Sequence, residues 1–553
     1  MLTSFSMEPL SLSGKRWHIP HDVCASMEDL IKQRLRNLED TGDRWNDPTV
    51  FPESVKAAER VQRAIKNKET IAIFGDYDCD GITSTAQMLR YFRRHGVEPI
   101  VKLPHRLHDG YGLREKHVDA FADAGVTLLV TVDTGVSAHE ALARAREQGI
   151  DVIILDHHHV TKTPDAYAVL HPALAENFPG AHPSAAGVTF LFLRALEGAD
   201  WTDRNTNITL AMIGTIADLV PLSGINRRIV QEGLRVLPTL PQSPLKELID
   251  AVSRGKPLTS IDIAFRIAPR INAAGRMDDP MIGLRAILDG GSDLQMLEAL
   301  NVSRQEETLR CTEHAIGQIE QLCHPEPVEG RTLPSFLAVA DPSYQAGIIG
   351  LIAGKLTEKF GRPSMAVSIQ NEMCTASLRS PTCYNIVEGL GRVSHLLTTF
   401  GGHAQAAGCS FPLDHFLELS DALAADVASN VPEELLSPTL TIDATLDAAD
   451  ISFQSIRKLQ KLEPFGQGNH EPVFLIRNAR MSSVRCVGNE GAHLQATIGA
   501  SKLIGFNHGD WREEAQSPVD IVCRVGIDTW QNRESVQLFL QDMRIAQEAF
   551  INR

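Results

Sequence analysis

The segment that decides the fold reads Ile71-Ala-Ile-Phe-Gly75-Asp76-Tyr-Asp78-Cys-Asp80-Gly81. Its apolar start predicts a buried strand, and a glycine and three alternating carboxylates follow at once. Carboxylates this close repel one another unless cations lie between them, and open α/β sheets bind ligands at the carboxyl ends of their strands. We therefore predict a divalent-metal site here. The alternative is an acidic turn that caps the next helix through Asp80 or Thr83.

Strands and helices alternate after this segment. An apolar strand at 127–132 ends at Asp133, and another at 151–155 ends at Asp156-His157-His158-His159. Alternation at this spacing predicts a doubly wound parallel sheet, with three strands ending in groups that can bind metal. Asp218 lies in an otherwise apolar helix, where a charged residue needs a partner, either a metal ion or an arginine.

Two later segments carry arginines close to glycine and proline. The loop at 104–113 contains Arg106, and residues 265–277 contain Pro269 and Arg276. We predict the second segment to be a broken loop that allows close approach to phosphate. The alternative is that its arginines pair with the aspartates nearby.

A long helix over 293–322 and a linker at 324–330 precede a second α/β unit, which begins near Phe336. In that unit the segments 376–380 and 400–403 are predicted as short loops of the kind that hold phosphate. Residues 414–450 contain nine acids and neither lysine nor arginine, so this region is not expected to touch nucleic acid.

Residues 439–553 change to short strands with turn signals, which predicts a small β-barrel. Phe506, Trp511 and Trp530 are of the type that stacks on bases, so an oligonucleotide-binding barrel fits. A purely structural β-domain is the alternative.

Bulk properties narrow the class of protein. A chain of 553 residues is too long for one core, so three or more domains are expected. A net charge of −16 argues against a generally basic nucleic-acid binder but leaves room for a local basic groove. Nine scattered cysteines without a Cys-x-x-Cys pair predict a reduced, cytoplasmic setting. We see no signal pattern and no apolar run of ~18 residues, so no membrane segment is expected.

Several motifs together resemble those of the DHH phosphoesterases. In chain order they are Gly75–Gly81, Thr131–Gly135, Asp156–His158 and Gly214–Asp218. Three further segments resemble the single-strand-specific exonucleases of that family: Pro269–Arg276, Gly401–His403 and Leu462–Asn469. The resemblance extends from about residue 55 to the end of the sequence.

The resemblance implies an α/β architecture: a parallel-sheet DHH domain, a long connecting helix, a smaller α/β DHHA1 domain and a C-terminal OB-type β-barrel. The expected boundaries are a lead-in at 1–52, the DHH domain at 53–290, the connecting helix and linker at 291–330, the DHHA1 domain at 331–430 and the barrel at 439–553.

The resemblance also implies a function: processive 5′→3′ hydrolysis of single-stranded DNA to 5′-mononucleotides, with two Mn²⁺ or Mg²⁺ ions, in DNA recombination and repair. The implied metal ligands are Asp78, Asp80, Asp133, His157 and Asp218, with Asp133 bridging the two ions. The implied catalytic residues are Asp133, His158 and Asp76. Binding of DNA and of its 5′-phosphate is implied for Arg106, Arg276, Ser377, Arg379 and His403.

One position departs from the family pattern. The usual Trp-His-x-Gly reads Tyr344-Gln-Ala-Gly347 here, so a histidine contact with the DNA backbone is expected to be missing. A helicase and a single-strand-binding protein are the implied partners of a monomeric enzyme. The alternatives are a DHH–DHHA1 phosphodiesterase of short RNA or cyclic dinucleotides, which usually lacks the barrel, and a non-catalytic DNA-binding scaffold, which usually lacks metal ligands.

Overall fold

The computed structural model describes residues 10–546 apart from 21–22, 39–46, 48, 107, 111, 177, 179, 199–200, 324–332 and 531–532. The chain divides into two compact units. The first comprises residues 1–36, 308–463 and 471–553, and the second comprises 37–307 and 464–470. The predicted linker at 324–330 lies outside the described residues. Among the helices described, none has the length and apolar character needed to cross a membrane.

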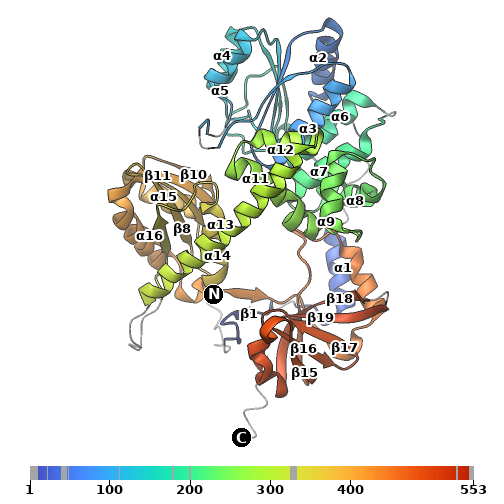
Figure 1. Cartoon of the computed structure of the whole chain (residues 1–553), viewed down its shortest axis with the longest axis vertical. Coiled ribbons are helices and arrows are strands. Elements are labelled where there is room, and N and C mark those ends of the chain that lie inside the picture. The colour runs from blue at the N-terminus through green and yellow to red at the C-terminus, as the bar shows by residue number, and fades with distance from the viewer. Residues whose placement is uncertain are drawn as a thin grey trace. The chain divides into compact units, whose positions relative to one another are not determined.

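The second unit is built on a parallel five-stranded sheet with the strand order β3-β2-β4-β5-β6 (Figure 1). The strands are β2 (Ile71–Gly75), β3 (Ile100–Lys102), β4 (Leu128–Val132), β5 (Asp151–Leu155) and β6 (Ala168–Leu170). The predicted parallel sheet is therefore confirmed. All five residues of β2 are buried, which explains its unbroken apolar sequence.

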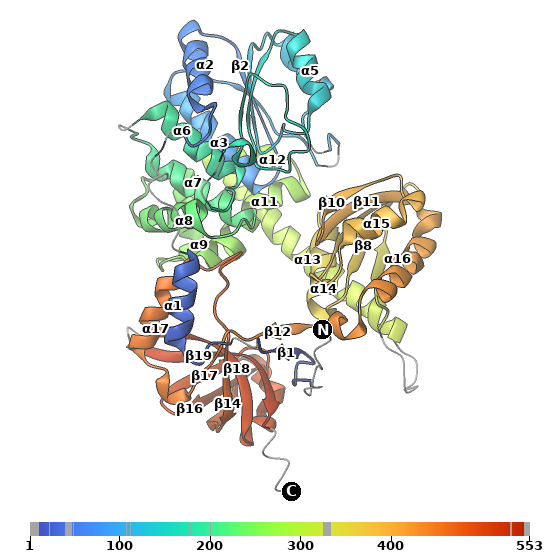
Figure 2. The same ribbon diagram turned by 180° about the vertical axis from the view of Figure 1, so that it is seen from behind.

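Helices cover both faces of this sheet (Figure 2). Ile71 and Ile73 of β2 pack into a core with α2 (Ser54–Asn67), α3 (Cys79–Arg94) and α6 (Ala185–Glu197). Ala72 and Phe74 point the other way, into a core with α4 (Glu115–Asp123) and α5 (His139–Glu147). Because successive residues of a strand face opposite sides, the apolar run has to supply both cores.

Further helices complete this unit. They are α7 (Arg204–Ala217), α8 (Gly224–Val236), α9 (Pro244–Ser253), α10 (Ser260–Asp262), α11 (Ala268–Met277) and α12 (Pro280–Leu288). The predicted broken loop at 265–277 is wrong, because a π-helical turn at Ile263–Ile267 leads directly into α11. Pro269 lies in the first turn of α11, directly after the π-helical turn, and the first turn is the part of a helix where proline is most common. The long helix α13 (Ser292–Cys323) matches the predicted connecting helix.

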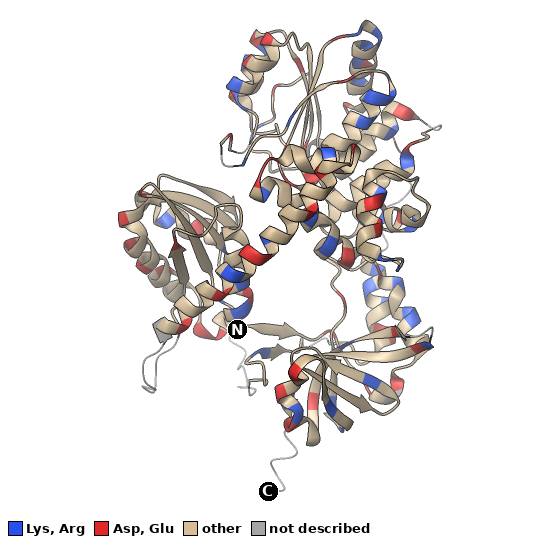
Figure 3. Ribbon diagram, in the orientation of Figure 1, with Lys and Arg blue, Asp and Glu red and all other residues tan. Residues whose placement is uncertain are grey.

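In the first unit, a five-stranded mixed sheet has the order β10-β11-β9-β8-β7. The strands are β7 (Leu337–Asp341), β8 (Ser364–Gln370), β9 (Met373–Arg379), β10 (Thr399–His403) and β11 (Ala406–Pro412), with α14 (Ile349–Phe360), α15 (Ile386–Arg392) and α16 (Phe416–Asn430) as helices. In Figure 3 the acidic positions of α16 are coloured red on the ribbon. The loops predicted at 376–380 and 400–403 are wrong, because β9 and β10 run through them. Their small residues pair across strands, as Gly401 does with Gly408.

The C-terminal part of the first unit forms a seven-stranded sheet with the order β13-β14-β18-β19-β17-β16-β15. Its strands are β13 (Ala444–Thr445), β14 (Phe474–Ala479), β15 (Ser482–Val487), β16 (His493–Ile498), β17 (Ser501–Gly505), β18 (Val519–Trp530) and β19 (Arg533–Ile545). Phe506 is 57% exposed, as predicted, whereas Trp511 is buried and stacks on His508 with ring centroids 3.8 Å apart. The Trp530 side chain lies outside the described part.

The N-terminal lead-in forms one strand and one helix. Strand β1 (Arg16–His18) pairs in parallel with β12 (Thr439–Thr441), and α1 (Met27–Leu38) follows it. Trp17 donates a hydrogen bond from its indole Nε1 to Asp542 Oδ2 at 2.8 Å. This contact ties the start of the described chain to β19.

Candidate metal centre

Acids and histidines gather at the carboxyl edge of the parallel sheet of the second unit. Three sets have ligand atoms within 4.8 Å of one another: Asp76, Asp78 and Asp133; Asp80, His157 and Asp218; and Asp133, His157 and His158. These sets bring together all five predicted metal ligands. Asp133 and His157 each belong to two of the sets, and of the two only the carboxylate of Asp133 has a second ligand oxygen with which to bridge two ions.

The side chains reach the cluster from four places in the chain: the segment between β2 and α3, the ends of β4 and β5, and the end of α7. Asp78 is the N-cap of α3, and its carboxylate accepts hydrogen bonds from the N–H groups of Asp80 and Gly81 at 3.0 and 3.1 Å. The acidic turn considered as the alternative does cap α3, but through Asp78 and not through Asp80 or Thr83. Asp80 instead accepts from the N–H groups of Ala185 and Ala186 at the start of α6, at 2.7 and 3.0 Å.

The cluster contains buried ligand atoms that make no hydrogen bond within the described part of the chain. His157 Nε2 lies 3.3 Å from Asp133 Oδ1, 3.6 Å from Asp218 Oδ2 and 3.9 Å from Asp80 Oδ2. Among the described residues, Asp133 Oδ1 and His157 Nε2 are buried and make no hydrogen bond. Buried polar atoms are rarely left unpaired, and carboxylates with one imidazole suit Mn²⁺ or Mg²⁺. The residues present therefore fit the metal ions that the sequence implies.

Protonation reflects the crowding of these acids. Burial, followed by repulsion from neighbouring carboxylates, raises the pKa of Asp133 well above its ordinary value. The same two causes raise the pKa of Asp218 to about 9 and that of Asp80 to about 7. Burial, followed by the charge of His158, lowers the pKa of His157 to about 4, so its imidazole is neutral and available as a ligand. Without cations, the folded cluster thus retains protons.

We expect the metal-free protein to lose stability as the pH rises from 6.5 to 8.5. Asp80 and Asp218 stay protonated in the folded chain up to a pKa of about 7 and about 9, but ionise near 3.8 when unfolded. The folded state therefore binds more protons in this window, and the free energy of unfolding falls with rising pH. One retained proton over this window is worth about 3 kcal/mol, or a fall of roughly 5–10 °C in melting temperature.

Thermal unfolding in EDTA, with and without excess Mn²⁺, measures this effect. Mn²⁺ should remove most of the pH dependence because bound cations hold the carboxylates ionised in the folded state. Asp218→Asn should flatten the metal-free curve. A melting temperature that stays constant or rises between pH 6.5 and 8.5 in EDTA would contradict the assignment.

His158 is held by a separate set of hydrogen bonds. Its Nδ1 lies 2.8 Å from Asp156 Oδ1, and the fully buried Asp156 also accepts from the N–H groups of His157, His158 and Val136. Burial alone would lower the pKa of His158, but the hydrogen bond and charge of Asp156 raise it to about 9. Asp156 thus orients and charges His158.

His171 is a functional residue that the sequence did not indicate. It is 1% exposed just after β6, and its Nδ1 accepts from Ala173 N at 3.0 Å. The other ring nitrogen, Nε2, therefore carries the proton and donates to the backbone carbonyl of His158 at 2.8 Å. A lone histidine after a short strand carries no sequence signal for this role.

Helix α11 packs directly on the carboxylate segment. Asn272 accepts a hydrogen bond from Cys79 N at 2.8 Å through its Oδ1. A Cβ on Gly275 would lie 2.4 Å from the carbonyl oxygen of Tyr77, so only glycine allows this approach. The Arg106 guanidinium lies over the Tyr77 ring, 4.4 Å from its centroid, and the charges of Arg106 and Arg276 both reach the Tyr77 hydroxyl. The two predicted phosphate-binding arginines thus flank the residue between Asp76 and Asp78.

Ser377, Arg379 and His403 belong to the first unit. Arg379 donates from Nη1 to Ser377 Oγ at 3.1 Å. Arg379 and His403 are both registered opposite Ala406 of β11, which puts them on one face of the sheet, two strand spacings or about 10 Å apart. The structure therefore brings these three residues to one face of their sheet, in a different unit from the metal cluster.

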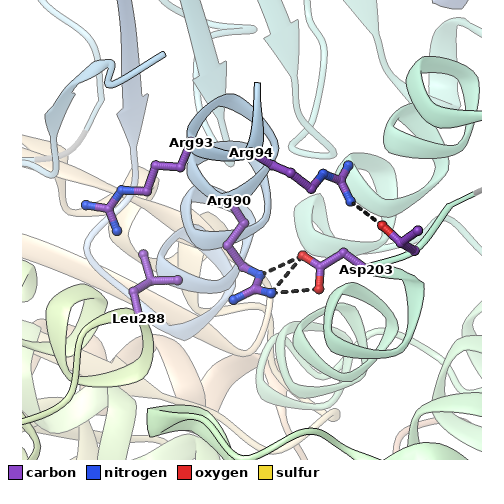
Figure 4. Close-up of a pocket in the computed structure, with 6 residues that line it drawn as sticks. Arg90, Arg93, Arg94, Asp203 and Leu288 are labelled. Atoms are coloured by element: carbon purple, nitrogen blue, oxygen red, sulfur yellow. Dashed lines mark hydrogen bonds and ion pairs between the residues drawn. The ribbon is translucent and has the colours of Figure 1, made fainter. Parts of the chain in front are cut away.

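A pocket of about 430 Å³ lies at the far end of α3 (Figure 4). Arg90, Arg93 and Arg94 line it together with Asp203. Arg90 forms a bidentate ion pair with Asp203, Arg93 pairs with Glu98 and Asp289, and Arg94 pairs with Glu197. Because the arginines already have carboxylate partners, this pocket is not a candidate phosphate site.

Comparison with known proteins identifies the family. Three family models match the chain: the N-terminal domain of the DHH family over residues 70–222, the DHHA1 domain over 334–429 and the RecJ OB domain over 442–542. The chain is 34% identical over 519 residues to the single-stranded-DNA-specific exonuclease RecJ of Bacillus subtilis, a match that covers 91% of this chain. It spans 64% of the length of that relative. It is 32% identical to the protein of the same name from Thermus thermophilus, over 88% of this chain and 70% of that one.

Solved structures agree with this match. The crystal structure of RecJ from Thermus thermophilus in complex with Mn²⁺ gives a TM-score of 0.80 at 27% identity and covers 96% of this chain and 80% of that one. The corresponding complex with Mg²⁺ gives a TM-score of 0.74 at 26% identity, over 96% and 79%. Both the predicted architecture and the predicted cofactors are thereby confirmed. With DHH, DHHA1 and OB segments in one chain and a full set of acids and histidines at the sheet edge, the chain belongs to the RecJ family of DHH phosphoesterases.

Proposed function

We propose that this chain hydrolyses single-stranded DNA from the 5′ end and releases 5′-mononucleotides, and that it acts in recombination and repair. The observation that carries the proposal is that two buried ligand atoms, Asp133 Oδ1 and His157 Nε2, make no hydrogen bond within a cluster of seven acidic and histidine residues. Burial of unpaired polar atoms lowers the stability of the fold, and a non-catalytic scaffold would gain no function in return. The RecJ OB match argues against a phosphodiesterase that lacks the barrel.

Some residues of the cluster are assigned to metal binding and others to proton transfer. Mn²⁺ or Mg²⁺ would be held by Asp78, Asp80, Asp133, His157 and Asp218, with Asp76 beside Asp78 and Asp133. When bound, these ions lower the pKa of a water molecule and stabilise negative charge on phosphate. His158 bonds Asp156 through Nδ1, so we assign its Nε2 as the donor to the scissile phosphate or the departing oxygen.

Arginines would set the polarity of the reaction, because only a chain end carries a terminal phosphate dianion. In the second unit Arg106 and Arg276 lie beside the carboxylate segment, and in the first unit Ser377, Arg379 and His403 share one face. We assign these residues to DNA and its 5′-phosphate. The exposed Phe506 ring would stack on bases of any sequence.

The remaining assignments are coarser. We propose the domain boundaries given above, a monomeric state, and partners of the helicase and single-strand-binding type. A cytoplasmic location is supported by the eight described cysteines, none of which forms a disulfide. At the family's Trp-His position, Tyr344 is buried and contacts His314 Nδ1 through its hydroxyl at 3.0 Å.

A strand blocked at its 5′ end tests the polarity. With Mn²⁺, a single strand with a 5′-phosphate and a blocked 3′ end should be degraded. The same strand blocked at the 5′ end should be degraded about 10–100-fold more slowly, because charge-assisted bonds worth about 1.5–3 kcal/mol are lost. Release of acid-soluble nucleotides measures both rates.

Arg276→Ala should reduce the preference for a 5′-phosphate over a 5′-hydroxyl, whereas the exposed Arg63→Ala in the same unit should not. Rapid digestion of the 5′-blocked strand would refute the phosphate-binding role. Failure to shorten any single strand with Mn²⁺ would refute the exonuclease itself.

A further inference from the structure

A short segment from the C-terminal half of the chain belongs to the second unit. Residues 464–470, named the strap here, group with residues 37–307, whereas the residues on both sides of the strap group with the first unit. Gly466 and Asn469 exchange two backbone hydrogen bonds of 2.9 and 3.1 Å. The Asn469 side chain, 3% exposed, donates from Nδ2 to Pro464 O at 2.9 Å. The strap is therefore a closed turn with its own internal hydrogen bonds.

Two hydrogen bonds from buried residues attach the strap to the second unit. Leu222 donates its backbone N–H to Gln467 O at 2.7 Å, and Ser260 donates its hydroxyl to Phe465 O at 2.6 Å. Leu222 is 2% exposed and Ser260 is 4% exposed. The strap accepts these bonds through backbone carbonyls, so its shape matters more than the side chain of Gln467.

Leu222 lies at the end of the loop that begins at Asp218. Asp218 is the C-cap of α7, and Leu219 follows with φ of +57°, a left-handed conformation that leucine rarely adopts. Pro221 has no N–H, and its carbonyl accepts from Asn226 Nδ2 at 3.0 Å. A loop with such strain holds its shape only where its surroundings support it. The strap supplies that support at Leu222, four residues from Asp218.

We propose that the strap is a positioning element of the metal site. By holding Leu222 and Pro221 in place, it fixes the course of the loop after α7 and thus the Asp218 carboxylate. This inference rests on the proposed function, because it takes Asp218 as a metal ligand. Groups that orient metal ligands commonly change metal affinity by about 10–100-fold when they are altered.

Gly468→Ala is the variant that displaces the strap. Gly468 has φ of +71°, and a Cβ there would lie 3.1 Å from Pro221 Cβ. The matched control is Gly499→Ala, which has φ of +57° and no atom within 4 Å of the added Cβ. Both variants bear the cost of a left-handed alanine, but only the first pushes against the Asp218 loop. Gln467→Ala is a second control, since the exposed side chain is removed and the carbonyl stays.

The measurements are direct titration of the full-length protein with Mn²⁺ and the Mn²⁺ concentration that gives half-maximal release of nucleotides. We expect Gly468→Ala to bind Mn²⁺ about 10-fold more weakly, to need about 10-fold more Mn²⁺, and to recover its maximal rate at excess Mn²⁺. Both controls should stay within about twofold of the unaltered protein.

A second variant keeps the test decisive if Gly468→Ala does not fold. Ser260→Ala deletes one hydroxyl and should weaken Mn²⁺ binding by about 2–10-fold, as loss of one hydrogen bond predicts. Unchanged Mn²⁺ affinity in a folded strap variant, or a loss of rate that excess Mn²⁺ does not restore, would overturn the positioning role. Absence of Mn²⁺ binding by the unaltered protein would instead overturn the proposed function.

Discussion

Asp133→Asn is expected to slow nucleotide release by about 1,000-fold or more, which corresponds to about 4 kcal/mol of transition-state stabilisation. Asp133 belongs to two of the three candidate ligand sets, as His157 does, and its carboxylate is the proposed bridge, so its loss should disturb both metal positions at once. Asparagine keeps the size of the side chain and removes only its charge and one oxygen ligand. Initial rates with a 5′-phosphorylated single strand and saturating Mn²⁺ measure the effect.

Asparagine is also the substitution that the backbone of Asp133 tolerates. Asp133 has φ of +61°, and asparagine accepts this left-handed conformation better than alanine does. Burial, followed by repulsion from neighbouring carboxylates, keeps a proton on Asp133 in the folded metal-free protein, and the unfolded chain releases that proton at neutral pH. Neutral asparagine avoids this cost of folding and should raise the melting temperature of the metal-free protein. Mn²⁺ should then stabilise the variant much less than it stabilises the unaltered protein.

Asp123→Asn is the matched control, since Asp123 is an exposed acid at the end of α4 in the same unit. It should leave the rate and the Mn²⁺ effect unchanged. If Asp133→Asn retains the rate of the control, Asp133 does not bridge the metal ions.

His158→Ala is expected to slow the reaction by about 100-fold or more, the usual contribution of a general acid or base. His158 is the charged member of the histidine pair, because Asp156 holds its Nδ1 at 2.8 Å and raises its pKa to about 9. Alanine removes this donor but keeps His157 as a ligand. His159→Ala is the control, because His159 is the exposed next residue of the same loop.

The pH dependence separates a proton donor from a structural histidine. If the His158 imidazolium donates, the rate falls as the pH rises through its pKa of about 9. Asp156→Asn removes the charge that raises this pKa, so the fall should move to lower pH by about one unit. A His158→Ala rate within twofold of His159→Ala, or an Asp156→Asn profile that keeps its position, would argue against this role.

The sequence by itself determined which residues gather in the candidate metal centre. Apolar runs predicted β2, β4 and β5, and each was followed directly by acids or histidines. Parallel strands bring such endings to one edge whatever the remaining packing is, so this part follows from local pattern and chain direction. Asp218 was recognisable because an acid in an apolar helix needs a partner.

Only the tertiary structure decided how those residues are held. Asp78 rather than Asp80 caps α3, because the Asp80 carboxylate accepts hydrogen bonds from N–H groups of α6, about a hundred residues later in the chain. The segment predicted as a loop forms helix α11 for a similar reason. Gly275 and Asn272 have low helix propensity, but in the fold they allow contact with the Tyr77–Cys79 backbone. The helix propensities of neighbouring residues carry no information about contacts this distant in sequence.

The same limit applies to the supporting residues. His171 donates a hydrogen bond to the backbone carbonyl of His158, and the strap accepts one from the backbone N–H of Leu222. Because nearly every residue type offers these backbone groups, the sequence does not indicate such contacts. Strands β9 and β10 were missed because their small residues are selected by cross-strand packing rather than by β propensity. The identities of the reactive groups were thus a local property of the sequence, whereas their orientation and protonation depend on distant backbone contacts and burial that only the fold provides.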